Sequence, residues 1–289
     1  GMRLHGIDFS SAPTRRKAIV VASGHLAAGA AAQGAAAGGA SIDLLAFEAL
    51  ETLAAFDEWL CRPGPWLGAF DFPFGWPREL IESLGWPAGN WAASIDHAAG
   101  LTRAELVSRL RAFCQARASG SKFAHRATDR PAGSSPSMKW VNPPVALMLH
   151  AGAPRLLAAG ATLPGLHPGD PARIALEAYP GFLARSIVGR ESYKSDDRSR
   201  QTPQRREARA RILAALASGE NRLAIAVRAD PGLVQACLDD ATGDRLDALL
   251  CLVQAAWAWQ RRDQAYGLPA RVDPLEGWIV SVPADGEAG

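Results

Sequence analysis

The chain has 289 residues, of which 48% are hydrophobic, and it carries a formal net charge of +2. This length and apolar content allow one large domain, or a core domain with an insertion, and exclude an intrinsically disordered protein; the nearly balanced charge neither requires nor excludes a nucleic-acid partner. The absence of a long apolar run, of a secretory hydrophobic region and of any Cys-x-x-Cys pair predicts a cytoplasmic protein with no membrane span, zinc site or disulfide framework.

The N-terminal part of the chain predicts three strands followed by a helix. Residues 3–9 alternate and then run apolar, which is typical of a buried strand. The β-branched run at 17–22 predicts the second strand of a hairpin, and residues 41–47 predict a third strand. Between these two strands the Ala/Gly-rich tract 27–40 predicts a flexible loop, because its glycines oppose a stable helix. An apolar stripe predicts a helix over residues 48–61.

A long segment rich in Trp, Pro and Gly follows the fourth predicted strand. That strand covers residues 66–71, after a Pro-Gly-Pro sequence that ends the preceding helix. Residues 76–172 contain one clear helix, which begins at a capping box of Thr102 and Glu105. We interpret this segment as an insertion or cap within a single domain spanning residues 1–289. Its tryptophans are expected to pack the cap against the core rather than to stack on bases: Trp76, Trp86, Trp91 and Trp140.

Regular patterning resumes in the C-terminal part of the chain. Residues 173–178 predict a further apolar strand. Thr202 and Pro203 are a good N-cap and first-turn residue for a helix that extends to Ser218, and a shorter helix begins in the same way at Pro231. A long helix is predicted over residues 244–262. Strands that alternate with helices in this order indicate a layered α/β sheet.

Five carboxylates fall at predicted strand ends or at the start of the last helix. Asp8 ends the first strand, Asp71 ends the strand after the crossover helix, and Glu177 lies near the end of a later strand. In an open α/β sheet ligands bind beyond the carboxyl ends of the strands, so these side chains can meet at one edge. Asp244 and Asp247 are three residues apart, which places both on one face of a helix.

This set of side chains predicts a divalent metal site. Carboxylates packed together repel one another, and a cation removes that cost. Mg²⁺ and Mn²⁺ prefer hard oxygen ligands, and two such ions about 3.5–4 Å apart can activate a water and stabilise the leaving oxygen of a phosphodiester. We therefore predict Mg²⁺ or Mn²⁺ as the cofactor. The predicted catalytic and metal-binding residues are Asp8, Asp71, Asp244 and Asp247, with Glu177 as a further metal ligand.

Each carboxylate also has a purely structural interpretation. Asp8 and Asp71 precede turns that they could order. Glu177 could pair with a basic side chain, and Asp244 and Asp247 could complement the positive end of a helix dipole. The set is more persuasive than any single member, because all five residues fall at strand ends or at a helix start.

Five short motifs occur in a fixed order along the chain. They are Gly6-Ile7-Asp8-Phe9-Ser10, Phe70-Asp71-Phe72-Pro73-Phe74-Gly75, Glu177-Ala178-Tyr179-Pro180, Tyr193-Lys194 and Asp244-Arg245-Leu246-Asp247-Ala248. Together they resemble the predicted-nuclease family numbered 429 among the domains of unknown function, over roughly residues 3–262. The resemblance implies a ribonuclease H-like mixed sheet flanked by helices, distantly similar to Holliday-junction resolvases. It also implies metal-binding roles for Asp8, Asp71, Asp244 and Asp247, and for Glu177.

Basic residues gather in two places that could contact a polyanion. Residues 194–211 include Lys194 and Arg198, and the Gly/Ser-rich part of the cap includes Arg126. We predict that these three residues contact substrate phosphates, together with Ser10. The alternative is a solvated helix face that only makes ion pairs along its own length.

Three functions are compatible with these features. The first is a nuclease that hydrolyses nucleic acid with two metal ions, and Asp8 is its bridging ligand. The second is an actin-like, ATP-dependent phosphotransferase, since such enzymes also begin with an aspartate strand and a small-residue hairpin. The third is a nucleic-acid-binding protein without catalytic activity, because a fold does not fix a function.

Overall fold

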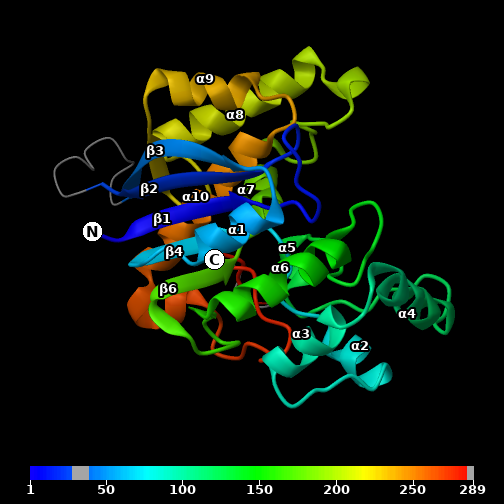
Figure 1. Ribbon diagram of the computed structural model, residues 1–289. Coiled ribbons are helices and arrows are strands. Elements are labelled where there is room, and N and C mark those ends of the chain that lie inside the picture. Colours follow the sequence, from blue (N-terminus) through cyan, green and yellow to red (C-terminus); the bar gives the residue numbers. More distant parts are fainter. Residues whose placement is uncertain (28–38, 285–289) are drawn as a thin grey trace.

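The protein folds around a mixed β-sheet (Figure 1). The structure is a computed structural model, and it describes residues 1–27 and 39–284. Within these residues the sheet has seven strands in the order β5-β6-β4-β1-β2-β3-β7. Their bounds are β1 Arg3–Asp8, β2 Ile19–Leu26, β3 Ala40–Leu50, β4 Trp66–Phe70, β5 Ala161–Thr162, β6 Asp170–Glu177 and β7 Ile225–Arg228.

The pairing of the strands brings several carboxyl ends to one edge of the sheet. β1 pairs in parallel with β4, and β4 pairs in parallel with β6. β2 is antiparallel to both of its neighbours, β1 and β3, whereas β3 and β7 are parallel. All strands except β2 therefore run in one direction, and the carboxyl ends of β1, β4 and β6 lie at the same edge. The predicted α/β sheet flanked by helices is confirmed.

One face of the sheet is covered by the helices of the C-terminal half (Figure 1). The long helix α10, Asp244–Gln260, packs directly on β1, β2 and β4. Around it lie α7 Pro180–Val188, α8 Pro203–Ser218 and α9 Pro231–Asp239, which share one hydrophobic core with α10. The helix predicted over residues 203–218 thus forms with those bounds, and Thr202 Oγ1 accepts a hydrogen bond from the Arg205 amide.

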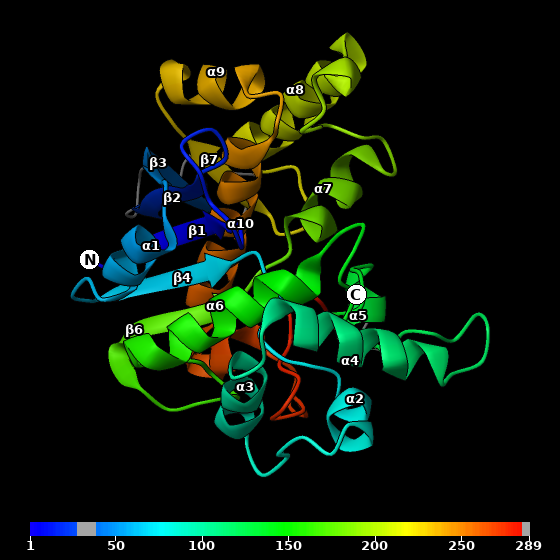
Figure 2. The ribbon, with the colours of Figure 1, turned by 45° about the vertical axis from the view of Figure 1, so that its right-hand side comes forward.

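The opposite face is covered by α1, Leu53–Leu60, and by the segment 76–172 (Figure 2). This segment contains several helices rather than one: α2 Arg78–Ser83, α3 Trp91–Ala99, α4 Arg103–Gln115, α5 Asp129–Ala132 and α6 Val145–Ala159. The predicted capping box of Thr102 and Glu105 is present at the start of α4. Trp76, Trp86 and Trp91 are buried in the core, as packing of the segment on the sheet requires.

Several predicted boundaries were wrong for an identifiable reason. The third strand extends to Leu50, because its later residues pair with β2, where Ile19 lies opposite Leu50. The helix predicted from residue 48 consequently starts at Leu53, with Thr52 as its N-cap. The short strand β7 and the helix α7 were not predicted at all. These elements are short, and the pairing that defines a strand is a tertiary property.

Part of the predicted Ala/Gly-rich loop, residues 28–38, lies outside the described residues. In the described part of the chain, no helix combines the length and the apolar character that a membrane crossing requires. The four cysteines are all free thiols.

Candidate functional site

Two aspartates lie side by side at the edge where β1 and β4 end. The register pairs Ile7 with Phe70, so Asp8 and Asp71 occupy the next position on neighbouring parallel strands. The Asp71 amide continues the pairing by donating a hydrogen bond to the Ile7 carbonyl oxygen at 2.9 Å. The sequence prediction that these two carboxylates share one edge is therefore met by the backbone geometry.

The first turn of α10 brings two further aspartates to the same edge. Gly6 makes the approach possible, because a Cβ atom at this position would lie 2.1 Å from the Ala248 carbonyl oxygen. The helix thus packs backbone against backbone on β1, two residues before Asp8. Asp244 begins α10 and Asp247 follows one turn later, so their carboxylates project near the strand ends.

The protonation of these aspartates shows how closely they interact. Burial raises the pKa of Asp8 well above its usual value, and the charges of Asp247, Asp244 and Asp71 raise it further. Burial and Asp247 raise the pKa of Asp71 to about 7, although Lys194 opposes the shift. Within residues 1–27 and 39–284, neither carboxyl group accepts a hydrogen bond. Burial and the neighbouring like charges therefore oppose the ionised forms of Asp8 and Asp71.

Two lysines and a tyrosine neutralise the carboxylates of α10. Asp247 is fully buried, and its two oxygens accept hydrogen bonds from the Tyr193 hydroxyl, at 2.6 Å, and from the Lys194 ammonium. Lys17 Nζ, on the segment before β2, donates to Asp244 Oδ1 at 2.6 Å and to Asp196 Oδ1 at 2.7 Å. Burial opposes the charge of Lys194, but Asp247 and its neighbours raise the pKa of Lys194 well above its usual value.

These partners were largely missed by sequence reasoning. Lys194 was predicted to contact substrate phosphates, which stays a prediction, but its ion pair with Asp247 was not predicted. Tyr193 belongs to a motif that we had noted, but no role was predicted for it. Lys17 was treated only as part of a strand. Its distance of 227 residues from Asp244 along the chain left no local signal for this pairing.

Glu177 and Arg126 form a separate, buried ion-pair cluster. Arg126 is 2% exposed, and its Nη1 and Nη2 donate to the two Glu177 carboxylate oxygens at 2.7 and 2.8 Å. Nη2 also donates to Asp129 Oδ1 at 2.9 Å, and the Phe74 amide donates to Glu177 Oε1 at 2.9 Å. A metal-ligand role for Glu177 or a substrate-binding role for Arg126 would require this bidentate pair to open.

The remaining two predicted substrate contacts lie on turns. Ser10 Oγ accepts a hydrogen bond from the Ala12 amide at 3.3 Å, which orders the turn after Asp8. Arg198 is exposed at the start of a short 3₁₀ helix, Arg198–Arg200. Their roles toward a substrate stay predictions.

The donor chemistry of the aspartates fits a hard divalent cation, but the ligands are not drawn together around one point. Among residues 1–27 and 39–284, no group of three His, Cys, Asp or Glu side chains is arranged closely enough to hold a metal ion. Asp247 and Asp244 instead accept hydrogen bonds from the ammonium groups of Lys194 and Lys17. We call the edge that carries these four aspartates the acidic edge. The ammonium groups of Lys17 and Lys194 already lie there, so a metal ion bound by Asp244 or Asp247 would have to displace at least one of them.

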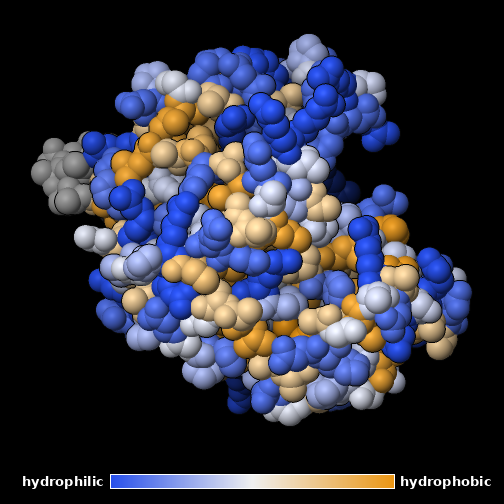
Figure 3. Space-filling view, viewed as in Figure 1, coloured by the Kyte–Doolittle hydropathy of each residue, from blue (hydrophilic) through white to orange (hydrophobic). Residues whose placement is uncertain are grey.

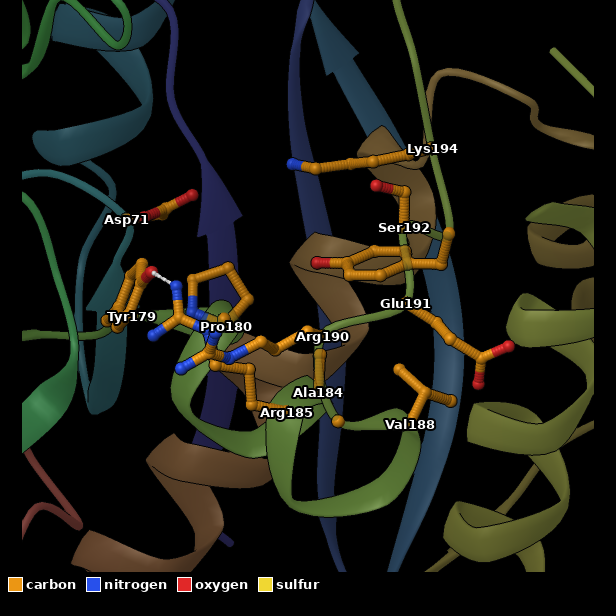
Figure 4. A pocket seen from close by; sticks show the side chains of 13 residues that line it. Asp71, Tyr179, Pro180, Ala184, Arg185, Val188, Arg190, Glu191, Ser192 and Lys194 are labelled. Carbon is orange, nitrogen blue, oxygen red and sulfur yellow. Dashed lines mark hydrogen bonds between the residues drawn. The ribbon is translucent and has the colours of Figure 1, made fainter. Parts of the chain in front are cut away.

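A cavity of about 320 Å³ opens beside Asp71, between α7 and the segment leading to Lys194 (Figure 4). Its lining includes three basic side chains, Arg185, Arg190 and Lys194. In Figure 4 the Lys194 side chain extends toward the side of the cavity that holds Asp71, and Arg185 donates to the Tyr179 hydroxyl, at 3.0 Å. The space-filling view shows the surface hollowed on the side where β1 and β4 end (Figure 3).

Comparison with known proteins identifies the family of this chain. Residues 6–273 match the family described as "Protein of unknown function (DUF429)". No curated protein and no solved structure matches the chain. The match covers most of the sequence and includes all four aspartates of the acidic edge.

Proposed function

We propose that this chain, which belongs to the DUF429 family, is a metal-dependent nuclease on a ribonuclease H-like fold, with Mg²⁺ or Mn²⁺ at the acidic edge. The observation that carries the proposal is the placement of four aspartates at one edge: Asp8 and Asp71 follow the last paired residues of neighbouring parallel strands, and Asp244 and Asp247 lie in the first turn of α10, which packs on β1. Strongly perturbed carboxylates beside a cavity are typical of functional sites.

The arrangement of the sheet supports the fold part of the proposal. The central strands run in the order β3-β2-β1-β4-β6, and β2 alone is antiparallel to the rest. A hairpin meander next to parallel strands, with helices on both faces, is the arrangement that a ribonuclease H-like fold requires. In such open sheets the ligand lies beyond the strand ends, which is where the aspartates are.

The chain's own residues can prepare the site for a phosphodiester. Asp8, Asp71 and Asp247 would hold the metal, with Asp244 as a further oxygen ligand. Bound divalent cations would supply an activated water and charge stabilisation for the leaving oxygen. The Tyr193 hydroxyl orients the Asp247 carboxylate, and the Lys194 ammonium is free to move toward a substrate phosphate once Asp247 is otherwise neutralised.

The test is Mn²⁺-dependent cleavage by wild type and by Asp8→Asn, on single-stranded and duplex DNA and RNA. We expect a loss of at least about 100-fold in rate for Asp8→Asn, because its site loses a ligand oxygen. The thermal unfolding curve should show that the variant is folded. Asp96→Asn, on the exposed surface of α3, is the matched control and should cleave at the wild-type rate.

Unchanged cleavage by Asp8→Asn would overturn the proposal. If wild type cleaves none of the four substrates in Mn²⁺ or Mg²⁺, the proposal also fails, and the other two functions separate by binding. Thermal stabilisation by ATP would select the phosphotransferase, whereas tight binding of an oligonucleotide would select the non-catalytic binding protein.

A further inference from the structure

Two cavities of different character meet at Asp71 and Tyr179. The larger one, of about 320 Å³, lies between α7 and residues 189–194. The smaller one, of about 80 Å³, lies between the strand ends and the segment 76–172. Asp71 and Tyr179 line both cavities, so the acidic edge stands at their junction.

The larger cavity is suited to a phosphate backbone. Arg185, Arg190 and Lys194 supply positive charge, against the carboxylates of Asp71 and Glu191. Arg185 is held in place, because its Nη1 donates to the Gly133 carbonyl oxygen at 2.6 Å and its Nη2 to the Tyr179 hydroxyl at 3.0 Å. Arg190 is exposed on the turn after α7, where it can reach a ligand without breaking such contacts.

The smaller cavity is suited to a flat, mostly apolar group with polar atoms at its edge. Phe72, Val145 and Met148 line it, and Ser134 and Ser135 add hydroxyl groups. Its volume of about 80 Å³ has room for roughly five to eight waters, which is about the size of a single ring system. Val145 and Met148 lie on α6 and the two serines lie in the loop before it, so the segment 76–172 builds one wall.

We propose that the acidic edge takes an unpaired stretch of polynucleotide, with the backbone in the larger cavity and one base in the smaller cavity. The inference rests on the proposed nuclease function and assigns its substrate class. A base that is paired and stacked in a duplex cannot enter a pocket of this size without leaving the helix, which costs a few kcal/mol. A single strand offers its bases without that cost, and its backbone follows a positively charged groove.

The first experiment measures binding in Ca²⁺, which is chosen to support binding without turnover. Fluorescein-labelled 12-residue DNA and RNA strands and the corresponding blunt duplexes are titrated with wild-type protein, and anisotropy is followed. We expect a single strand to bind at least about tenfold more tightly than its duplex, and the tighter of DNA and RNA identifies the sugar. Equal or tighter binding of both duplexes would overturn the inference.

The second experiment assigns the two cavities with variants. Arg190→Ala should weaken binding of the single strand and lower the slope of log affinity against log salt by about 0.7, because one phosphate contact is lost. Arg103→Ala is the matched control, since Arg103 is exposed on α4 and lines neither cavity. If Arg190→Ala and Arg103→Ala show the same affinity and the same salt dependence, the phosphate backbone does not bind in the larger cavity, and the assignment is overturned.

Ser135→Trp tests the smaller cavity, because the indole would fill it. It should weaken binding of the normal strand several-fold and leave unchanged the binding of a strand in which abasic spacers replace the bases. Equal effects on both strands would contradict a base in this cavity. The binding and cleavage experiments test the two proposals separately. A preference for single strands without cleavage would refute only the nuclease function. Cleavage with a preference for duplexes would refute only the proposed substrate class.

Discussion

Two groups of carboxylates lie next to each other at the strand ends, and their surroundings differ. At the acidic edge, burial and like charges raise the pKa of Asp8 and of Asp71. In the part of the chain that the structure describes, neither carboxyl group accepts a hydrogen bond. In the adjacent buried cluster, Glu177 and Asp129 share the guanidinium of Arg126. Its Nη1 and Nη2 atoms donate hydrogen bonds of 2.7–2.9 Å to the two carboxylates. Arg126 therefore compensates the charges of Glu177 and Asp129, whereas Asp8 and Asp71 have no comparable partner among the described residues.

The difference lies in whether the protein supplies a counter-charge for the buried carboxylate. Burial raises the pKa of Glu177, but Arg126 and the Phe74 amide counteract that shift, and the cluster closes the gap between the core and the segment 76–172. Among the described residues, Asp8 and Asp71 have no such hydrogen-bonding partners, so they hold their protons more tightly than an ordinary aspartate, and an external cation would have to displace those protons. An unpaired acidic group is costly to the fold, and it persists where another requirement maintains it.

Replacing the Arg126 guanidinium should have the largest effect on stability. We expect Arg126→Met to lower the free energy of unfolding by about 3–5 kcal/mol, because two buried carboxylates lose their counter-charge. The measurement is urea unfolding at neutral pH. Arg62→Met is the matched control: Arg62 also makes a bidentate pair, with Glu48, but both side chains are exposed, and the expected cost is about 0–1 kcal/mol. Equal losses in the two variants would show that burial of the Arg126 cluster is irrelevant to its role.

Removing a lysine of the acidic edge should have a smaller effect that a metal ion reverses. Lys194→Met leaves the fully buried Asp247 with Tyr193 alone, and we expect a loss of about 1–2 kcal/mol, reduced by the 42% exposure of the lysine side chain. The loss should shrink in millimolar Mn²⁺, because the cation replaces the missing charge and binds only the folded state.

Lys17→Met provides the comparison within the same edge. Its partner Asp244 is more exposed than Asp247, so the expected loss is about 0–1 kcal/mol. Urea unfolding with and without Mn²⁺ gives both numbers. A Lys194→Met loss that is the same in the presence and absence of Mn²⁺ would mean that no cation competes for the Lys194 position.

The contrast between the two clusters also marks the limit of sequence reasoning. The positions of Asp8 and Asp71 follow from the rule that functional side chains lie at the carboxyl ends of strands. The same rule selects Glu177, which is on the next parallel strand at the same level as Phe70. Its partner Arg126 lies 51 residues earlier, in a segment whose patterning is irregular, so no local signal distinguishes a paired glutamate from an available one.

The helices show a similar division. The helix α8, with an N-cap residue and a first-turn proline, was predicted with its observed bounds, and the start of α4 was predicted from its capping box. The helix α7, which forms a wall of the larger cavity, begins with Pro180 but has no side-chain cap, and it was not predicted. Tyr193 and Lys17 reach the acidic edge only through tertiary packing, which periodicity does not report.

The pH dependence of stability provides a further test of the acidic edge. The pKa of Asp71 is about 7 in the folded protein, against an ordinary value near 4, so between these values the folded state holds a proton that the unfolded state has released. Because the folded state then binds more protons, the free energy of unfolding falls as pH rises through this window. Asp71→Asn removes the titrating group and should flatten this part of the profile.

At pH 4 wild type and Asp71→Asn should be about equally stable, and at pH 8 the variant should be more stable by about 1–2 kcal/mol. The full shift would correspond to about 4 kcal/mol, and the partial exposure of Asp71 together with the nearby Lys194 reduces it. Urea unfolding across pH 4–8 measures the difference. Mn²⁺ at pH 8 should raise the melting temperature of wild type more than that of the variant, since Asp71 is then a ligand rather than an unpaired charge. Parallel pH profiles for the two proteins would show that the pKa of Asp71 is not raised in the folded protein. The acidic edge would then not differ from the Arg126 cluster in having an uncompensated carboxyl group.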